Sequence, residues 1–491
     1  MKIENLIGKC LLCGKEYQEY DTSPVRTAVE ARHCGCSSTS LGIKGIEERF
    51  GDSYSLFPTV YPIPREEASG GLPDDEARKK IVIPPAPDRL PAIDALAFRW
   101  PAAQEPAEAQ DRLPLPYVEQ PDETGGLRCG NATLHDMDQV ATLFGITHGS
   151  LTVCDMSTYQ WSNTLKDPRS WAVIRNALRA GIKALGVWTA GNAGLSIAKI
   201  AYVVNRRLKP EDRIQVYCYS ASLAEEVRAV IQGFRADVSE MPTPVQAAIY
   251  TPWMAFENLN AQLPRGGKID PATYWDVSDG WDGVGLYMYR LLGRQLCAHL
   301  DPKPDYIVAP VGTGDLFFGL HLGRMDCLEK GLLEPSQCQL VAAIPEGESI
   351  LTNYEFYRLH PHGADFRESA SSEWPVAPKL TTVYTPLLFV MYRAFCHAKR
   401  VLVSRKEQWH AAKVLLGNPE PWLATEPSAL VAFGALRQLA TLHETEGRPR
   451  TQQIMERGTE MNVLVVSTGL GIMGQSEAEY MRYNLKDATA L

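Results

Sequence analysis

The chain has 491 residues, of which 45% are hydrophobic and 22% charged, so it is long enough for two or three ordinary globular domains. Its formal net charge of -9 argues against a nucleic-acid partner, which usually binds to a basic patch. No apolar run approaches the length of a membrane span, and the first residues lack the apolar core of a secretory signal, so we expect no membrane partner. Eleven cysteines, most of them single and in apolar stretches, favour free thiols in a reducing cytoplasm.

Four cysteines near the start of the chain have a spacing that predicts a structural zinc site. Cys10 and Cys13 form a CxxC pair, and Cys34 and Cys36 follow as a CxC pair. Zinc ribbons hold their metal with two cysteine knuckles of this kind, so residues 1–40 are expected to form a zinc-ribbon-like element. The CxC pair is tighter than a usual second knuckle, and His33 could replace one of its thiolates. The alternative is that all four thiols are free.

The next segment, residues 41–126, is rich in Pro, Ala and acidic side chains and contains no recognisable chemistry. Its frequent prolines block long helices. We expect an extended segment that wraps a larger domain, or an insertion.

From residue 127 the pattern changes to alternating strands and helices. A helix is expected from about His135, with Val140, Leu143 and Phe144 on one face. The later elements are, in order, a strand at 150–156, a helix at 171–180, a strand at 184–188, a helix at 195–205, a strand at 214–220, a helix at 223–234, a strand at 306–310, a helix at 316–325, a strand at 338–347, a long helix from 426 to about 442 and a strand ending at 467. This alternation predicts parallel sheets covered by helices, whose ligands bind at the carboxyl ends of strands.

Two glycine loops follow predicted strands, one at Thr189–Gly194 and one at Gly312–Asp315. A strand, a glycine turn and a helix start together present backbone N–H groups and a positive helix end to a phosphate. Glycines also simply make tight turns. Asp315 could cap the helix that follows, and its charge would have to point away from a phosphate.

Lys166 lies just before a predicted helix N-terminus, in the stretch Thr158–Arg169. A lysine backed by phosphate-binding loops suggests a cofactor held as a Schiff base, and pyridoxal phosphate (PLP) is the cofactor that uses a lysine in this way. Most lysines are solvated surface groups, so the prediction depends on the other motifs. The last strand ends in the hydroxyls of Ser467 and Thr468, which can bind a cofactor or cap a turn.

Six short motifs resemble, in the same order, those of the PLP enzymes of fold type II, the tryptophan synthase β and threonine synthase class. They are Gly130-Asn-Ala-Thr-Leu134, Asn163-Thr-Leu-Lys166-Asp167, Thr189-Ala-Gly-Asn192, Gly312-Thr-Gly-Asp315, Glu426-Pro-Ser-Ala429 and Ser467-Thr-Gly-Leu-Gly471. The resemblance is greatest to threonine synthase and cysteate synthase. It implies an α/β fold with two doubly wound, mostly parallel sheet domains: a large PLP-binding domain of residues 127–171 and 306–491, and a smaller mobile domain of residues 172–305.

The resemblance also implies a role for each matching residue. Lys166 would be the catalytic lysine that binds the cofactor. The loop that would bind the substrate carboxylate comprises Thr189, Ala190, Gly191, Asn192 and Ala193, with Asn192 also touching the phenolic oxygen of PLP. The loop that would bind the cofactor phosphate comprises Gly312, Thr313, Gly314 and Asp315. Thr468, or alternatively Ser467, would lie beside the pyridine nitrogen. The sequence departs from the family pattern at Pro168 and at Ala190, which replaces a hydroxyl.

The chemistry that the resemblance implies is β- or γ-elimination on an amino acid, often followed by addition of a nucleophile. The amine of Lys166 would be the base that removes the α-proton. Two substrates stay open: O-phosphohomoserine, as in threonine synthase, and O-phosphoserine, as in cysteate synthesis with sulfite. A different alternative is a catalytically inactive homologue that serves as a binding or scaffold protein. A homodimer is expected by analogy alone.

Overall fold

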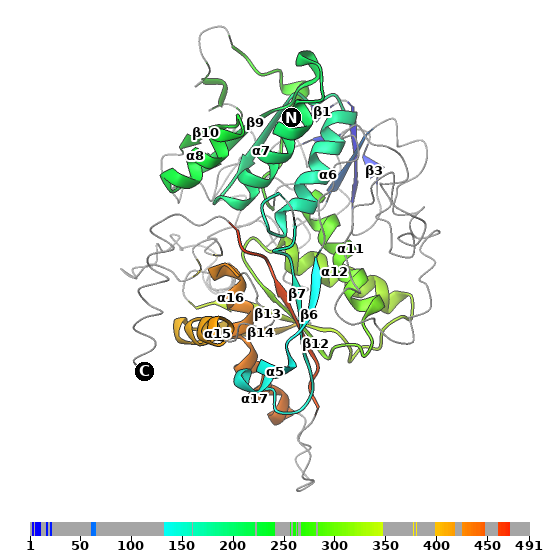
Figure 1. The fold of residues 1–491 in the computed structure, drawn as a ribbon. Helices are drawn as coiled ribbons and strands as arrows, with labels where there is room; N and C mark the ends of the chain where they lie inside the picture. The colour runs from blue at the N-terminus through cyan, green and yellow to red at the C-terminus, as the bar shows by residue number, and fades with distance from the viewer. Residues whose placement is uncertain are drawn as a thin grey trace, which may run out of the picture.

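A computed structural model describes the chain at 2–3, 5–10, 16–17, 20–21, 60–64, 132–159, 161–220, 223–240, 267–280, 283–346, 398–417, 425–446 and 460–471, and at a few positions between 256 and 263 and at 377 and 380. Two parallel sheets, one above the other in Figure 1, form the body of this part of the chain. The predicted α/β class with parallel sheets is therefore confirmed.

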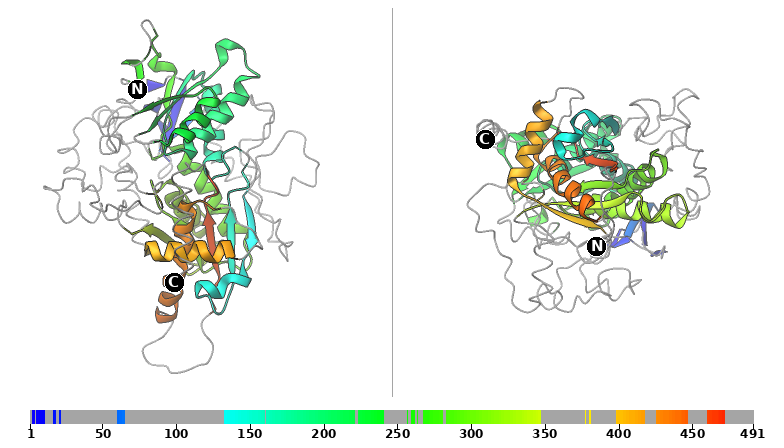
Figure 2. Two further views of the ribbon diagram at one scale, coloured as in Figure 1. Left: turned by 60° about the vertical axis from the view of Figure 1, so that its left-hand side comes forward. Right: turned by 90° about the horizontal axis from the view of Figure 1, so that it is seen from below.

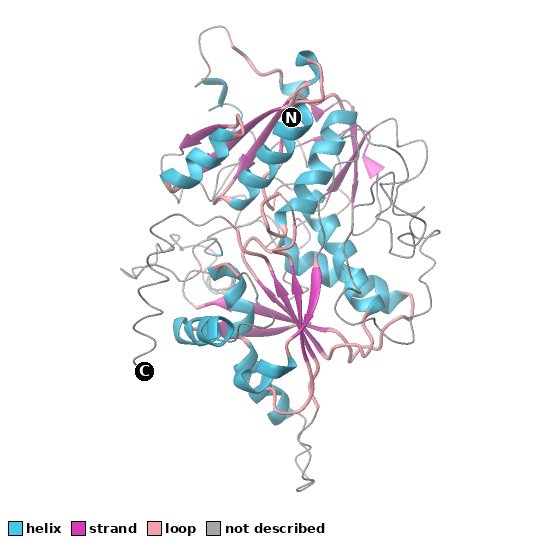
Figure 3. Ribbon diagram, viewed as in Figure 1, coloured by secondary structure: helices cyan, strands magenta, loops and turns pink. Residues whose placement is uncertain are grey.

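The larger sheet has six strands in the order β14-β13-β12-β15-β7-β6, and only β6 runs antiparallel to its neighbour. These strands fan across the lower half of Figure 3, and in the left view of Figure 2 the red strand β15 lies beside the cyan strands from the start of this sheet. Their bounds are β6 (Thr133–Asp136), β7 (Leu151–Asp155), β12 (Tyr306–Pro310), β13 (Gln339–Pro345), β14 (Lys399–Val403) and β15 (Val463–Ser467).

Both faces of the large sheet are buried, which explains why its strands are continuous apolar runs instead of alternating ones. In β12, Ile307 and Ala309 belong to one hydrophobic core, whereas Tyr306 and Val308 belong to a second core on the opposite face. The helices that cover these faces are α12 (Asp315–Glu329), α15 (Arg405–Gly417), α16 (Pro427–Gly434) and α17 (Leu436–Glu446).

The smaller sheet has four parallel strands in the order β10-β9-β8-β11. Its strands are β8 (Ala184–Trp188), β9 (Gln215–Ser220), β10 (Asp237–Glu240) and β11 (Tyr274–Asp276). The helices beside it are α6 (Lys166–Arg179), α7 (Asn192–Asn205) and α8 (Glu225–Gly233). The glycine loop at 189–191 therefore connects the carboxyl end of β8 to the start of α7.

Helices α11 (Gly283–His299) and α12 approach each other closely enough to exclude side chains at their contact. A Cβ atom on Gly323 would lie 2.3 Å from the Arg290 carbonyl oxygen, and one on Gly319 would lie 2.4 Å from the Tyr289 Cβ atom. Beside these glycines Arg290 forms a two-pronged ion pair with Asp326, with both N–O distances at 2.8 Å. This contact fixes α12, and with it the loop that precedes α12.

Two predicted helices differ from the structure. Residues Thr133–Asp136 form strand β6, which pairs with β7, so the helix expected from His135 begins only at α5 (Asp138–Ala141) and continues as a 3-10 turn, η4 (Thr142–Phe144). Val140 and Phe144 are buried as expected, but Leu143 is 46% exposed. The long helix predicted from Glu426 is broken at Ala435, directly after Gly434, where a Cβ atom would lie 2.5 Å from Val403 Cγ1.

The N-terminal segments form small antiparallel sheets. Strand β2 (Leu6–Cys10) pairs with β3 (Glu16–Tyr17) and with β5 (Val60–Pro64), and β1 (Lys2–Ile3) pairs with β4 (Tyr20–Asp21). Cys10 ends β2, whereas Cys13, Cys34 and Cys36 lie outside the described residues, so the zinc ribbon stays a prediction. Within the described ranges, no cluster of three metal-binding side chains and no helix able to cross a membrane is found.

Candidate active site

Five of the six predicted motifs meet at one cavity of about 110 Å³ between the carboxyl ends of the two sheets. The predicted residues that line it are Lys166, Ala190, Asn192, Ala193, Gly312, Thr313, Gly314, Asp315 and Thr468. The other lining residues are Leu165, Asp279, Pro310, Leu316, Leu380, Glu426 and Ser428. Thr189, Gly191 and Ser467 are buried and do not line the cavity, so of the two hydroxyls at the end of β15 only that of Thr468 belongs to it.

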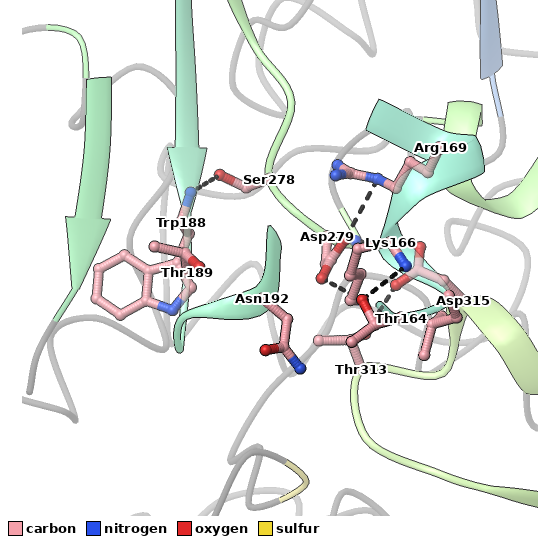
Figure 4. A network of polar contacts seen from close by, with 12 residues as sticks. Thr164, Lys166, Arg169, Trp188, Thr189, Asn192, Ser278, Asp279, Thr313 and Asp315 are labelled. Carbon is pink, nitrogen blue, oxygen red and sulfur yellow. Dashed lines mark hydrogen bonds and ion pairs between the residues drawn. The ribbon is translucent and has the colours of Figure 1, made fainter. Parts of the chain in front are cut away.

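Lys166 is the first residue of α6, and its side chain points into the cavity (Figure 4). The Asp167 carboxylate fixes this helix start because it accepts hydrogen bonds from Trp161 N and Ser162 N before the helix and from Ser196 Oγ on α7. Burial raises the pKa of Asp167, and these hydrogen bonds oppose the rise. Pro168 lies in the first helical turn, where a backbone N–H has no helical partner, so this departure from the family pattern does not interrupt the helix.

Backbone hydrogen bonds tie the lysine segment to the end of β15. Leu165 N donates to the Thr468 carbonyl at 3.1 Å, and Leu470 N donates to the Asn163 carbonyl at 3.0 Å. Gly469, with φ +112°, lies between them, and a Cβ atom there would be 2.2 Å from the Asn163 oxygen. These bonds hold in direct contact two motifs that are about 300 residues apart in the sequence.

The loop after β8 is shaped by Thr189 and continues into Asn192. The Thr189 hydroxyl accepts hydrogen bonds from Gly191 N and Gly194 N, both at 2.8 Å, and so closes the loop on itself. Asn192 is the first residue of α7, and its Nδ2 atom donates to both carboxylate oxygens of Glu426 at 3.2 and 3.0 Å. Asn192 and Glu426 therefore link the small-sheet loop to the start of α16.

The loop after β12 has the form that a phosphate requires. Gly314, with φ +97°, precedes α12, and the backbone N–H groups of Gly312, Thr313 and Gly314 have no hydrogen-bond partner among the described residues. Asp315 does not occupy the capping position of α12. Its carboxylate turns aside and accepts from Gly280 N at 3.2 Å and from Thr313 Oγ1 at 2.8 Å.

Asp279, which no sequence motif identified, carries the strongest electrostatic contact of the cavity. Lys166 Nζ donates to its Oδ2 atom at 2.6 Å, and Arg169 Nε lies 3.2 Å from its Oδ1 atom. Burial by itself would raise the pKa of Asp279, but the charges of Lys166 and Arg169 hold it below its ordinary value. Burial and the nearby Asp279 carboxylate raise the pKa of Asp315, against the influence of Lys166.

Two buried hydroxyls on the cavity wall lack a hydrogen-bond partner in the described part of the chain: Ser428 Oγ in the first turn of α16 and Thr468 Oγ1 after β15. A buried hydroxyl without a partner costs free energy, roughly 1–3 kcal/mol, so these two hydroxyls are available to a group bound in the cavity. A ring nitrogen is a suitable acceptor. Together with the unpaired N–H groups of the Gly312 loop and the Lys166 amine, these residues fit PLP.

Asp276, at the end of β11, should make the free energy of unfolding depend on pH. Burial raises its pKa to about 6, although Ser278 and Tyr274 bind its carboxylate. Because the folded pKa lies above the unfolded one, its contribution to stability is complete below about pH 4 and is lost as the pH rises through 6. Relative to Asp276→Asn, the wild-type free energy of unfolding should fall by on the order of 2 kcal/mol between pH 4 and 7, measured with urea. A constant difference would contradict this prediction.

No protein-family model and no curated protein matches this sequence. The chain is similar to a number of solved structures, among them the following two. One is a mutant O-ureido-L-serine synthase with O-ureido-L-serine bound (TM-score 0.48, 15% identity, covering 73% of this chain and 91% of that one). The other is serine racemase from Dictyostelium discoideum (TM-score 0.48, 14% identity, 69% and 92%). At these values neither likeness says anything about activity, which has to be inferred from the residues of the site.

Proposed function

We propose that this protein is a PLP-dependent enzyme that acts on an amino acid. One observation carries the proposal: Lys166, the Gly312–Asp315 loop and Thr468, which are far apart in sequence, line one small cavity. The resemblance requires this convergence, and a lysine that pointed away from the Gly312 loop would have been incompatible with it.

Each residue has a definite task in the proposed enzyme. The N–H groups of Gly312, Thr313 and Gly314, at the positive end of α12, would hold the cofactor phosphate. The hydroxyl of Thr468 or Ser428 would bind the ring nitrogen, and Lys166 would hold the cofactor covalently until the substrate amine replaces it. PLP supplies a ring that delocalises the electron pair left when the α-proton is removed. The Lys166 amine takes that proton.

The reaction that we propose is β- or γ-elimination, with or without replacement. A neutral hydroxyl at the ring nitrogen, in place of a carboxylate, leaves that nitrogen largely unprotonated and so favours loss of a leaving group. A threonine-synthase-like reaction on O-phosphohomoserine is the first candidate, and β-replacement on O-phosphoserine with sulfite is the second. The described lining residues provide the carboxylates of Asp279, Asp315 and Glu426 but no cation besides Lys166, so a substrate phosphate would need a cation from elsewhere in the chain.

Cofactor uptake and product release test the proposal in sequence. Purified protein titrated with PLP should become yellow and should bleach with borohydride, leaving the cofactor attached to the Lys166 peptide. Phosphate release is then measured from O-phosphohomoserine and O-phosphoserine, each with and without sulfite. Protein that takes up no PLP would reject the enzyme and favour the inactive homologue. Protein that binds PLP but releases no phosphate would reject both substrates and leave the cofactor assignment intact.

The role of Thr468 can be separated from that of its neighbour. Thr468→Val keeps the side-chain shape but removes the hydroxyl, so PLP affinity should fall by about tenfold, the effect of one lost hydrogen bond. Ser467→Ala is the matched control, because Ser467 is buried but does not line the cavity. Fluorescence titration with PLP measures both. A loss of affinity in the Ser467 variant alone would reverse the assignment.

A further inference from the structure

Asp279 joins two basic side chains that leave the same turn of α6. Lys166 and Arg169 are three residues apart, a spacing that puts them on one face of a helix. Each contacts a different oxygen of the Asp279 carboxylate, at 2.6 Å and 3.2 Å respectively (Figure 4). Asp279 lies in the segment that follows β11 of the small sheet, so this segment supplies the carboxylate that contacts both basic side chains of α6.

The carboxylate of Asp279 is held from both sides. Behind it, the Arg169 side chain is only 1% exposed and also donates to the Val277 carbonyl. A Cβ atom on Gly285 would lie 3.0 Å from Arg169 Cδ, so this arginine has little room to move. Ahead of it, Gly280 N is bound to Asp315. The segment around Asp279 is therefore held at Val277 and at Gly280 by contacts that do not involve Lys166.

The geometry points to Asp279 as the positioning residue that holds the Lys166 amine whenever this amine is not bonded to the cofactor. This inference rests on the proposed function of Lys166. In the cofactor-free protein, Lys166 Nζ donates a hydrogen bond to Asp279 Oδ2 at 2.6 Å. The two positive charges that lower the pKa of Asp279 keep the acceptor anionic at neutral pH, and a hydrogen bond between two charged groups is stronger than one between neutral groups.

The same contact serves the proposed proton transfer. When the substrate amine has replaced Lys166, the α C–H bond breaks, the proton forms a new N–H bond at Lys166 Nζ, and the electron pair stays with the substrate and cofactor. The resulting ammonium again donates to Asp279 Oδ2. Asp279 thus keeps the amine in the cavity between the two events, while itself neither gaining nor losing a proton.

Chemical modification of Lys166 in the cofactor-free protein tests the inference directly. Reductive methylation with formaldehyde and cyanoborohydride requires an unprotonated amine, and mass spectrometry of the Lys166 peptide gives the rate at pH 8. In Asp279→Asn, Lys166 should react about tenfold faster than in the wild type, because a charge-assisted hydrogen bond is lost. Asp279→Ala should change the rate in the same direction.

Asp276→Asn is the matched control, because Asp276 is a buried carboxylate three residues earlier with no hydrogen bond to Lys166. It should leave the Lys166 rate unchanged, and the rate at exposed Lys183 should be equal in all variants, which shows that the reagent acts equally on each of them. Wild-type Lys166 reactivity in both Asp279 variants would overturn the inference. Because this measurement needs no cofactor, it separates a failure of the Asp279 contact from a failure of PLP binding.

In the loaded enzyme, the inference predicts an effect on proton transfer more than on binding. Exchange of the substrate α-proton with D₂O, followed by NMR, should slow in Asp279→Asn by about tenfold, with kcat falling more than KM. An increase in KM with unchanged kcat and exchange would assign Asp279 to substrate binding and overturn the positioning role.

Discussion

Replacing Lys166 by Ala is expected to abolish turnover and the yellow colour together. The variant loses the group that attaches the cofactor and also the base that removes the α-proton, so the rate of product formation should fall on the order of 10³-fold or more. Absorbance after PLP addition, mass spectrometry after borohydride treatment and product formation measure the three consequences separately. The fold should be kept, because the Lys166 side chain is part of the cavity wall and not of the hydrophobic core.

Lys183→Ala is the control for this prediction. Lys183 precedes β8, and its side chain is 41% exposed and pairs with Asp212 at the surface. This variant should bind and retain PLP as the wild type does. If Lys166→Ala still formed a borohydride-reducible adduct on another lysine and turned over substrate at the wild-type rate, the assignment of Lys166 would be wrong.

Asp326→Ala should have the largest effect on stability. Asp326 pairs with Arg290 through two short contacts and lies 3.5 Å from Arg294, and both arginine side chains are less than a tenth exposed. Removal of the carboxylate takes this ion pair away from two buried positive charges, and breaking a buried pair in this way typically costs about 3–5 kcal/mol. Equilibrium unfolding in urea at pH 7 gives the difference in unfolding free energy from the wild type.

The contrast with a surface ion pair makes the prediction specific. Asp212→Ala removes the partner of Lys183, where both side chains are well exposed, and should change the unfolding free energy by less than about 1 kcal/mol. Because α11 and α12 meet at the Asp326 pair and α12 follows the Gly312 loop, Asp326→Ala should also weaken PLP binding while Asp212→Ala should not. Equal effects of the two substitutions would mean that the buried pair does not stabilise the contact between α11 and α12.

The cavity residues that could be predicted from the sequence are those that lie next to a strand end or a helix start recognisable from the neighbouring residues. Gly312–Asp315 follows a short apolar run that predicts a buried strand, and Thr468 follows another, so both were expected at strand carboxyl ends, where the structure has them. Lys166 was predicted just before a helix and Asn192 in the glycine loop before another, and the structure has each as the first residue of its helix. Such patterns are local, which is why a single sequence contains them.

Asp279 could not be predicted because its importance comes from partners at a distance. It lies 113 residues from Lys166, in a segment whose sequence resembles any polar loop. Strand β6 was missed for a related reason: its identity depends on pairing with β7, while its own residues include the charged and polar His135 and Asp136. The break at Ala435 follows a glycine, Gly434, that lies close to Val403, a contact that helix propensity does not register.

The backbone hydrogen bond from Leu165 to Thr468 fixes more than a local turn. It sets the separation between the amine-bearing residue and the hydroxyl after β15, two groups that would address opposite parts of one planar ligand. Both ends of this bond lie outside the strands of the small sheet. The backbone bond therefore keeps the lysine segment and the segment after β15 at one separation. Movement of other parts of the cavity wall can change what surrounds a ligand without changing the distance between these two segments.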